Sequence, residues 1–142
     1  MWKHKIKKKY QQCQPLLNST FFSIGWGRTE YDGKTSDLLK KVRIPIVELE
    51  TCKKDYNRYS MTDGVERQVF DSNICTGGEG FESEFFGDSC QGDSGGPVTF
   101  FDRKKVGTVV GIISWGEKCA MEGLPGVNIR VEKYGVCLKG KK

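Results

Sequence analysis

Residues 87–98 read GDSCQGDSGGPV and place Ser94 between an acidic residue and two glycines. A serine hydroxyl keeps its proton at neutral pH, so it becomes a nucleophile only when a base lies within hydrogen-bond reach. Glycines on both sides predict a turn in which the backbone can approach another group closely. The stretch indicates either a reactive serine or an ordinary glycine-rich β-turn, and the base that distinguishes the two must come from elsewhere.

The length and the cysteine content bound the class of protein. A chain of 142 residues makes one domain of ordinary size, which buries roughly 68% of the surface exposed by the unfolded chain. Six cysteines and the sequon Asn18-Ser19-Thr20 favour an oxidising, secretory compartment over the cytosol. We therefore expect a secreted protein with a glycosylation site at Asn18, although a three-residue sequon also arises by chance.

The excess positive charge lies in the first ten residues, MWKHKIKKKY. Their five lysines leave 18 basic residues against 18 acidic residues in the rest of the chain. A block of charge at a chain end is usually a solvated tail, so we expect no binding to nucleic acid. The same lysines leave no apolar run for a signal peptide. Residues 1–20 are therefore predicted to be a basic segment that is disordered or wrongly assigned, and residues 21–142 to be the folded domain.

The apolar stretches of the chain have the length of β-strands and are bounded by glycine, proline or charge. They read TFFSIGWG (20–27), LLKKVRIPIV (38–47), PVTFFD (97–102), VGTVVGIISWG (106–116) and PGVNIRV (125–131). Short strands separated by turn residues predict an all-β barrel or sandwich, and no stretch is apolar enough to cross a membrane. One short helix is predicted near residues 48–56, where Glu50 and Lys54 have helical spacing.

Five motifs then follow one another in a recognisable order. They are Gly-Trp-Gly at 25–27, Asn-Ile-Cys-Thr-Gly at 73–77, the Ser94 motif, Ser-Trp-Gly at 114–116 and Pro-Gly-Val at 125–127. In this order they resemble the C-terminal half of a trypsin-like serine protease domain, from about residue 21 to residue 131. The resemblance implies a six-stranded antiparallel Greek-key barrel, the second barrel of that fold, with a vestigial C-terminal helix. The family's first barrel is not expected within this chain.

The resemblance assigns the nucleophile to Ser94 and the oxyanion hole to the backbone N–H groups of Gly92 and Ser94. The histidine base and the aspartate that orients it belong to the first barrel in this family. The single histidine of the chain, His4, lies among lysines with no strand to position it, so we do not expect it to be the base. Asp93, which pairs with a new amino terminus when these enzymes are activated, is expected to be without its usual partner.

The resemblance also assigns a substrate pocket. Asp88 would lie at its bottom and select arginine or lysine, while Gly116 and Gly126 would leave room for the long side chain. Ser114, Trp115 and Gly116 would pair with an extended substrate backbone, although Trp115 could equally be a core residue. Asn128 departs from the family, which usually has tyrosine at this position, and this leaves the shape of the pocket open.

Six cysteines allow 15 pairings, and the family pattern selects two of them. Cys52 would pair with Cys75, and Cys90 with Cys119. Phe21 and Phe100 occupy the two positions of a third family disulfide, and we expect them to replace it by apolar contact. The pairing of the remaining two cysteines, Cys13 and Cys137, is left open.

Residues 77–87, GGEGFESEFFG, are predicted to form a solvated loop. The three glutamates Glu79, Glu82 and Glu84 raise the possibility of calcium, but their spacing matches no known calcium-binding loop. We therefore expect no metal and no cofactor.

The sequence favours a secreted serine endopeptidase, a hydrolase that acts on protein or peptide substrates after arginine or lysine. A missing first barrel and protein inhibitors are its other expected partners. The alternative is a non-catalytic protease homologue that binds or regulates other proteins. A chain derived from an incomplete gene would account for the absence of a first barrel and of a signal peptide, and we expect the chain alone to be inactive.

Overall fold

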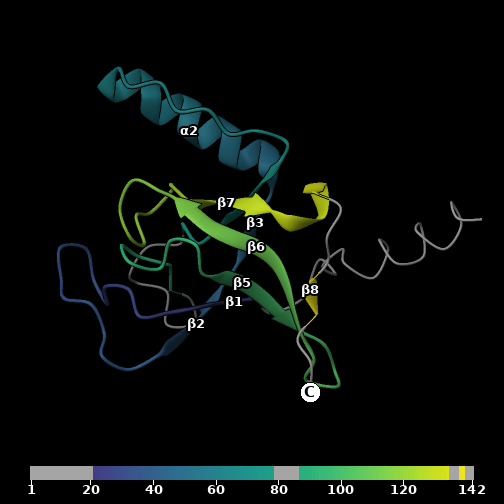
Figure 1. Cartoon of the computed structure of the whole chain (residues 1–142). Coiled ribbons are helices and arrows are strands. Elements are labelled where there is room, and N and C mark those ends of the chain that lie inside the picture. Colours follow the sequence, from purple (N-terminus) through teal and green to yellow (C-terminus); the bar gives the residue numbers. More distant parts are fainter. Residues whose placement is uncertain (1–20, 79–86, 135–137, 140–142) are drawn as a thin grey trace, which may run out of the picture.

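An antiparallel sheet that curls back on itself makes up most of the computed structural model, which describes residues 21–78, 87–134 and 138–139, the last two by their backbone (Figure 1). The strands are β1 (Phe21–Gly25), β2 (Lys40–Ile44), β3 (Ile46–Val47), β4 (Asn73–Thr76), β5 (Pro97–Phe101), β6 (Gly107–Trp115), β7 (Gly126–Arg130) and β8 (Leu138–Lys139). Their order across the sheet is β2-β1-β5-β6-β7-β4-β3, with β8 beside β6. The all-β prediction is confirmed.

The sheet closes through a single bent strand. β2 and β3 stand at the two ends of the sheet order, yet only Pro45 separates them in the chain. Proline has no N–H to donate, so it interrupts the ladder and lets the strand bend. The stretch thus pairs with β1 before the proline and with β4 after it. With β2 and β3 counted as one strand, six strands form the predicted Greek-key barrel.

Apolar side chains from β1, β2, β4, β5 and β6 fill the interior of the barrel. The buried cluster consists of Phe21, Ile44, Ile74, Val98, Val110 and Ile113. Phe21 lies opposite Phe100 in the β1–β5 ladder, with ring centroids 6.2 Å apart. The predicted contact between these two phenylalanines, in place of a disulfide, is therefore confirmed.

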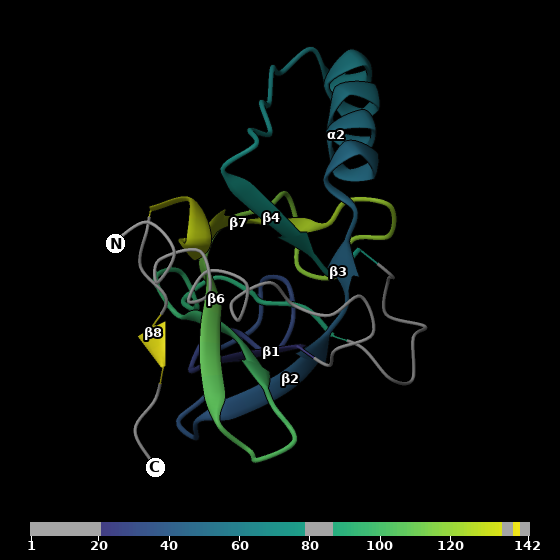
Figure 2. The same cartoon turned by 90° about the vertical axis from the view of Figure 1, so that its right-hand side faces the viewer.

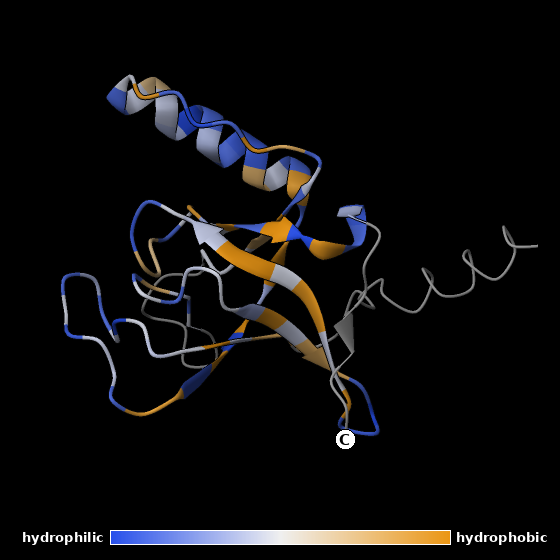
Figure 3. Ribbon diagram, in the orientation of Figure 1, coloured by the Kyte–Doolittle hydropathy of each residue, from blue (hydrophilic) through white to orange (hydrophobic). Residues whose placement is uncertain are grey.

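The helix α2 (Leu49–Asp63) is longer than the predicted residues 48–56. Its end is set by Gly64, which has φ +73° and donates its N–H to the carbonyl of Ser60, a left-handed cap that favours glycine. Only Cys52 and Tyr56 of the helix are buried. Most side chains of residues 57–63 are exposed, which agrees with the hydrophilic surface of α2 in Figure 3 and with its place beyond β3 and β4 in Figure 2.

The C-terminal segment differs from the predicted vestigial helix. A single 3-10 turn, η1 (Val131–Tyr134), follows β7, and β8 then pairs with Thr108 and Val109 of β6. β7 reaches β6 only from Gly111 onward, so this part of β6 has an open edge. An open edge offers unpaired N–H and C=O groups, and pairing with β8 satisfies them. Among the described helices, none has the length and apolarity required to cross a membrane.

Replacing Phe21, which is buried against Phe100, should destabilise the barrel. We expect Phe21→Ala to lower the free energy of unfolding by about 3–5 kcal/mol, because it leaves a cavity in the apolar cluster. The matched control is Phe70→Ala, at a side chain that is 53% exposed, which should cost less than about 1 kcal/mol. Denaturant unfolding measures both, and equal losses would contradict the proposed core contact.

Candidate functional site

One disulfide joins the Ser94 loop to a neighbouring loop, and a second joins the helix to the barrel. Cys90 and Cys119 have Cα atoms 5.1 Å apart and join the Ser94 loop to the loop after β6. Cys52 and Cys75 have Cα atoms 6.4 Å apart and join α2 to β4. Both predicted pairings are therefore present in the structure.

Ser94 lies exposed in a turn that is fixed to β6. Gly95 donates its N–H to the carbonyl of Ile113 at 2.8 Å, and Ile113 donates to the carbonyl of Gly96 at 2.9 Å. Gly92 has φ +96°, and a Cβ there would lie 3.1 Å from Cα of Gly27. Both the conformation and the close approach therefore require glycine at position 92.

In the part of the chain that the structure describes, the backbone amides of Gly92 and Ser94 have no hydrogen-bond acceptor. Within residues 21–78 and 87–134, neither amide donates a hydrogen bond, and the Ser94 hydroxyl has no partner either. Two unpaired amides at an exposed turn are available to an anionic oxygen of a bound molecule. Residues 21–142 contain no histidine, so the folded domain holds no imidazole beside Ser94.

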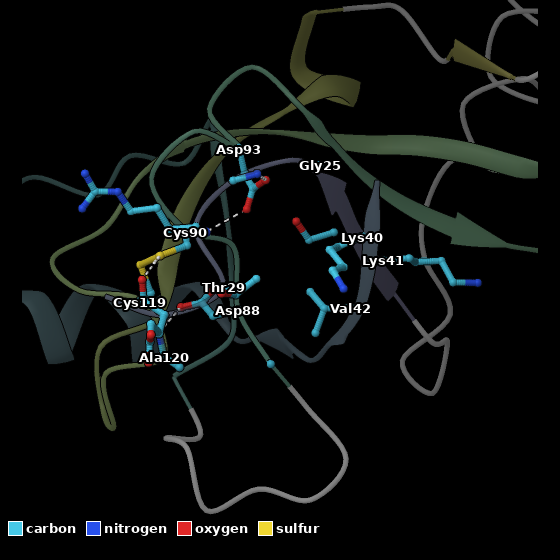
Figure 4. A pocket seen from close by; sticks show the side chains of 15 residues that line it. Gly25, Thr29, Lys40, Lys41, Val42, Asp88, Cys90, Asp93, Cys119 and Ala120 are labelled. Carbon is cyan, nitrogen blue, oxygen red and sulfur yellow. Dashed lines mark hydrogen bonds between the residues drawn. A yellow bond between two sulfur atoms is a disulfide. The ribbon is translucent and has the colours of Figure 1, made fainter. Parts of the chain in front are cut away.

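The side chain of Asp93 lines a cavity of about 390 Å³ (Figure 4). It accepts hydrogen bonds from the N–H of Gly27 at 2.7 Å and from the N–H of Cys90 at 2.9 Å. A Cβ on Gly25 would lie 2.0 Å from one Asp93 oxygen, so this close packing depends on the glycine. Lys40 of β2 also lines the cavity.

A second pocket, of about 200 Å³, brings together most of the predicted site residues. Its lining includes Asp88, Ser94, Ser114, Trp115, Gly116 and Gly126. A Cβ on Gly126 would lie 3.5 Å from the Asp88 carboxylate, and a Cβ on Gly116 would lie 3.5 Å from Cα of Gly126. The two glycines thus face one another above the acid, and larger residues would narrow the pocket.

Burial controls the ionisation of Asp88. Its carboxylate accepts the N–H groups of Ser89 at 2.8 Å and Ala120 at 2.9 Å. Removal from water raises the pKa of Asp88 to about 6, even though these two donors act in the opposite direction, and the nearby charge of Asp93 adds to the rise. The pocket therefore ends in an acid that a bound cation would hold in its ionised form.

The edge of β6 beside the pocket is open. β5 pairs with β6 as far as Ile112, and the backbone of Ile113 is hydrogen-bonded to the turn at residues 95–96. Among the described residues, 114–116 have no ladder partner on that side, because β7 lies on the other. An extended peptide can add to such an edge as a further strand.

Sequence reasoning did not identify the contribution of Tyr56. Its ring packs edge-on against Trp115 with centroids 4.9 Å apart, and its hydroxyl donates to the carbonyl of Pro125 at 2.7 Å. Trp115 is 36% exposed, so one part of it lines the pocket and another part packs on the helix. The four-residue spacing of Cys52 and Tyr56, which puts them on one helical face, was the available signal.

Asn128 lies inside the barrel and does not line the pocket. It is 1% exposed, and its Nδ2 donates to Thr76 Oγ1 at 2.9 Å and to the carbonyl of Ile74 at 3.2 Å. These bonds fix the orientation of the amide, while Oδ1 has no partner among the described residues. Several further predictions lie outside the described residues: those on His4, Cys13, Asn18, Glu79, Glu82, Glu84 and Cys137.

Comparison with known proteins identifies relatives of one kind. The profile of the family named Trypsin matches residues 6–136. The chain is 44% identical to Trypsin-1 of Astacus astacus over 78% of its own length and 41% of that protein. It is 36% identical to Trypsin eta of Drosophila melanogaster, over 85% and 40%, and 37% identical to Venom protease of Bombus pensylvanicus, over 85% and 46%. The chain therefore spans less than half the length of these relatives.

The partly buried carboxylate of Asp88 predicts a pH dependence of stability. Folded Asp88 holds its proton up to a pH of about 6, whereas an unfolded aspartate releases it near pH 4. The folded state thus binds more protons in this window, and the free energy of unfolding should fall by on the order of 2–3 kcal/mol as the pH rises through it. Urea unfolding of the wild type and Asp88→Asn between pH 4 and 7.5 measures the effect. Identical slopes would contradict it.

Proposed function

The chain belongs to the trypsin family of serine proteases, and from this premise we propose that residues 21–142 form the second barrel of a secreted endopeptidase that cleaves after arginine or lysine. The observation that carries the proposal is a single pocket lined by both Ser94 and Asp88. Ser94 would act on the scissile bond, and Asp88 would hold the substrate side chain that precedes this bond.

The pocket supports a basic substrate side chain. Gly116 and Gly126 add no side chains to its lining, and Asp88 supplies a carboxylate. A bound guanidinium or ammonium would favour the ionised form of Asp88 and offset the cost of its burial. The open edge at residues 114–116 would hold the substrate backbone, while Ser94 would face the bond to be cleaved.

The free amides of Gly92 and Ser94 support an oxyanion hole. In acyl transfer the carbonyl oxygen of the substrate becomes negative as the serine adds to its carbon, and amides aimed at that oxygen stabilise the charge. Removing one such donor typically lowers kcat about 100- to 1000-fold. Gly92 would therefore contribute through its backbone alone.

The base and its orienting acid would come from a first barrel that docks beside Ser94. The segment between β1 and β2 supports this assignment, because it exposes Trp26 by 57% and Leu38 by 71%. The N–H of Arg28 donates to the carbonyl of Gln91, so the segment lies against the Ser94 loop. A partner that covers these apolar side chains would therefore bring its own residues close to Ser94. The cavity at Asp93 would receive the new amino terminus on activation.

Secretion is proposed on chemical grounds. The two disulfides are stable in an oxidising compartment, and Asn18 belongs to a sequon for glycosylation. Protein substrates and protein inhibitors are the proposed partners of the pocket. The alternative is a non-catalytic homologue that binds peptides without cleaving them, and the absence of histidine from residues 21–142 favours it for the chain on its own.

A reconstitution experiment tests the proposal. The chain alone should neither react with a fluorophosphonate probe nor cleave an arginine amide above a Ser94→Ala control. In Ser-His-Asp sites the three residues act as a unit, and losing the base lowers kcat by roughly a factor of 10⁶. Addition of an activated first barrel from a related trypsin should produce labelling at Ser94.

The substrate preference is tested in the same reconstituted sample. Asp88→Ser should abolish the preference for arginine and lysine while Ser94 still reacts with the probe, because the two residues serve different steps. Robust cleavage by the unassisted chain would overturn the assignment of the base to a first barrel. Failure of the two parts to give any labelling, with docking demonstrated by sedimentation, would favour the non-catalytic alternative.

A further inference from the structure

The wall of the substrate pocket ends in a short segment, residues 116–118, that carries an acid. Glu117 follows Gly116 directly, and its side chain is 24% exposed. The segment lies between Trp115, which packs on Tyr56, and Cys119, which is tied to Cys90. Gly116 and Lys118 are both exposed, so the Glu117 side chain is the part of the segment that turns toward the protein.

Arg67 meets Glu117 from the segment that follows α2. Its Nε donates to Glu117 Oε1. Its Nη1 and Nη2 donate to the two oxygens of Asp63 at 2.9 and 2.7 Å, and Nη1 also donates to the carbonyl of Val65 at 2.8 Å. The guanidinium also lies 4.9 Å from the ring centroid of Tyr59.

These contacts distinguish Arg67 from an ordinary surface arginine. Its side chain is only 13% exposed, and within residues 61–70 Val69 alone is more buried. The two-pronged bond to Asp63 fixes the plane of the guanidinium, so its Nε points in one direction. Asp63 ends α2, and the helix is attached to β4 by the Cys52–Cys75 disulfide. Arg67 is therefore a rigid connection between the helix and the pocket wall.

We propose that Arg67 is a positioning residue that holds Glu117, and with it Gly116, at the width the pocket needs for a basic side chain. This inference rests on the proposed function of the pocket. A Cβ on Gly116 would be only 3.5 Å from Cα of Gly126, so a small displacement of residue 116 changes the opening above Asp88.

The experiment uses the whole disulfide-bonded chain and two independent measurements. ¹⁵N relaxation reports the order of the Glu117 amide, and fluorescence titration reports the binding of p-aminobenzamidine, a small aromatic cation. Arg67→Met should lower the order parameter at residues 116–118 from about 0.85 to below about 0.6, with no change at Val110 and Ile113. Probe affinity should fall about 5- to 10-fold, and Arg67→Lys should restore part of it.

Control variants separate the loss of the Arg67–Glu117 contact from a general loss of stability. Arg58→Met removes an exposed ion pair with Asp55 on the same helix and should change neither measurement. Glu117→Ala should loosen the segment as Arg67→Met does, and the double variant should be no looser than either single one. Glu117→Ala also provides the test if Arg67→Met fails to fold. Unchanged order at residues 116–118 in these variants, or an equal loss throughout β6, overturns the proposal.

Failure of the proposed function has a different signature. Asp88→Ser should abolish probe binding and leave the order of residues 116–118 as in the wild type. If the wild-type chain binds no probe, or Asp88→Ser binds it equally well, the assignment of the pocket is wrong, while the relaxation data still decide whether Arg67 holds the wall.

Discussion

The closure of the barrel through residues 40–47 is the constraint on which the rest of the structure depends. One strand, bent at Pro45, pairs with β1 by its first half and with β4 by its second. β7, which carries Gly126, pairs directly with β6, and the turn after β1 lies against the Ser94 loop. Without the bent strand, β1 and β4 would each have an open edge, and the barrel that holds these elements would not close.

Within this frame, the site is formed by backbone that approaches other groups where side chains are absent. Gly25 leaves space for the Asp93 carboxylate, Gly92 for the turn at Gly27, and Gly126 for Asp88. Each glycine loses more backbone entropy on folding than another residue would. The disulfide between Cys90 and Cys119 offsets part of this loss, because it restricts the unfolded chain around the same loops. A glycine-rich site and a disulfide beside it thus depend on each other.

The sequence predicted those features that a local pattern or a family motif encodes. The strands followed from short apolar runs bounded by turn residues, whereas both disulfides and the contact of Phe21 with Phe100 followed from the family resemblance. The length of α2 did not, because residues 57–63 contain only two apolar or aromatic side chains, Tyr59 and Met61, and only Gly64 marked the end. The bond between Arg67 and Glu117 joins positions 50 residues apart through side chains of common types. No pattern in one sequence predicts such a pair, because its geometry exists only after the barrel closes.

The carboxylates of Asp88 and Glu117 differ in whether each already has a counter-ion. Asp88 is partly removed from water and, among the described residues, has two backbone donors and no ion pair. Its ionised form is therefore costly, and a basic ligand would relieve this cost. Glu117 does not line the pocket and already has Arg67 as its partner, so it would gain less from a bound cation. Of the two carboxylates, the one without a counter-ion would therefore be the one that a basic ligand stabilises more.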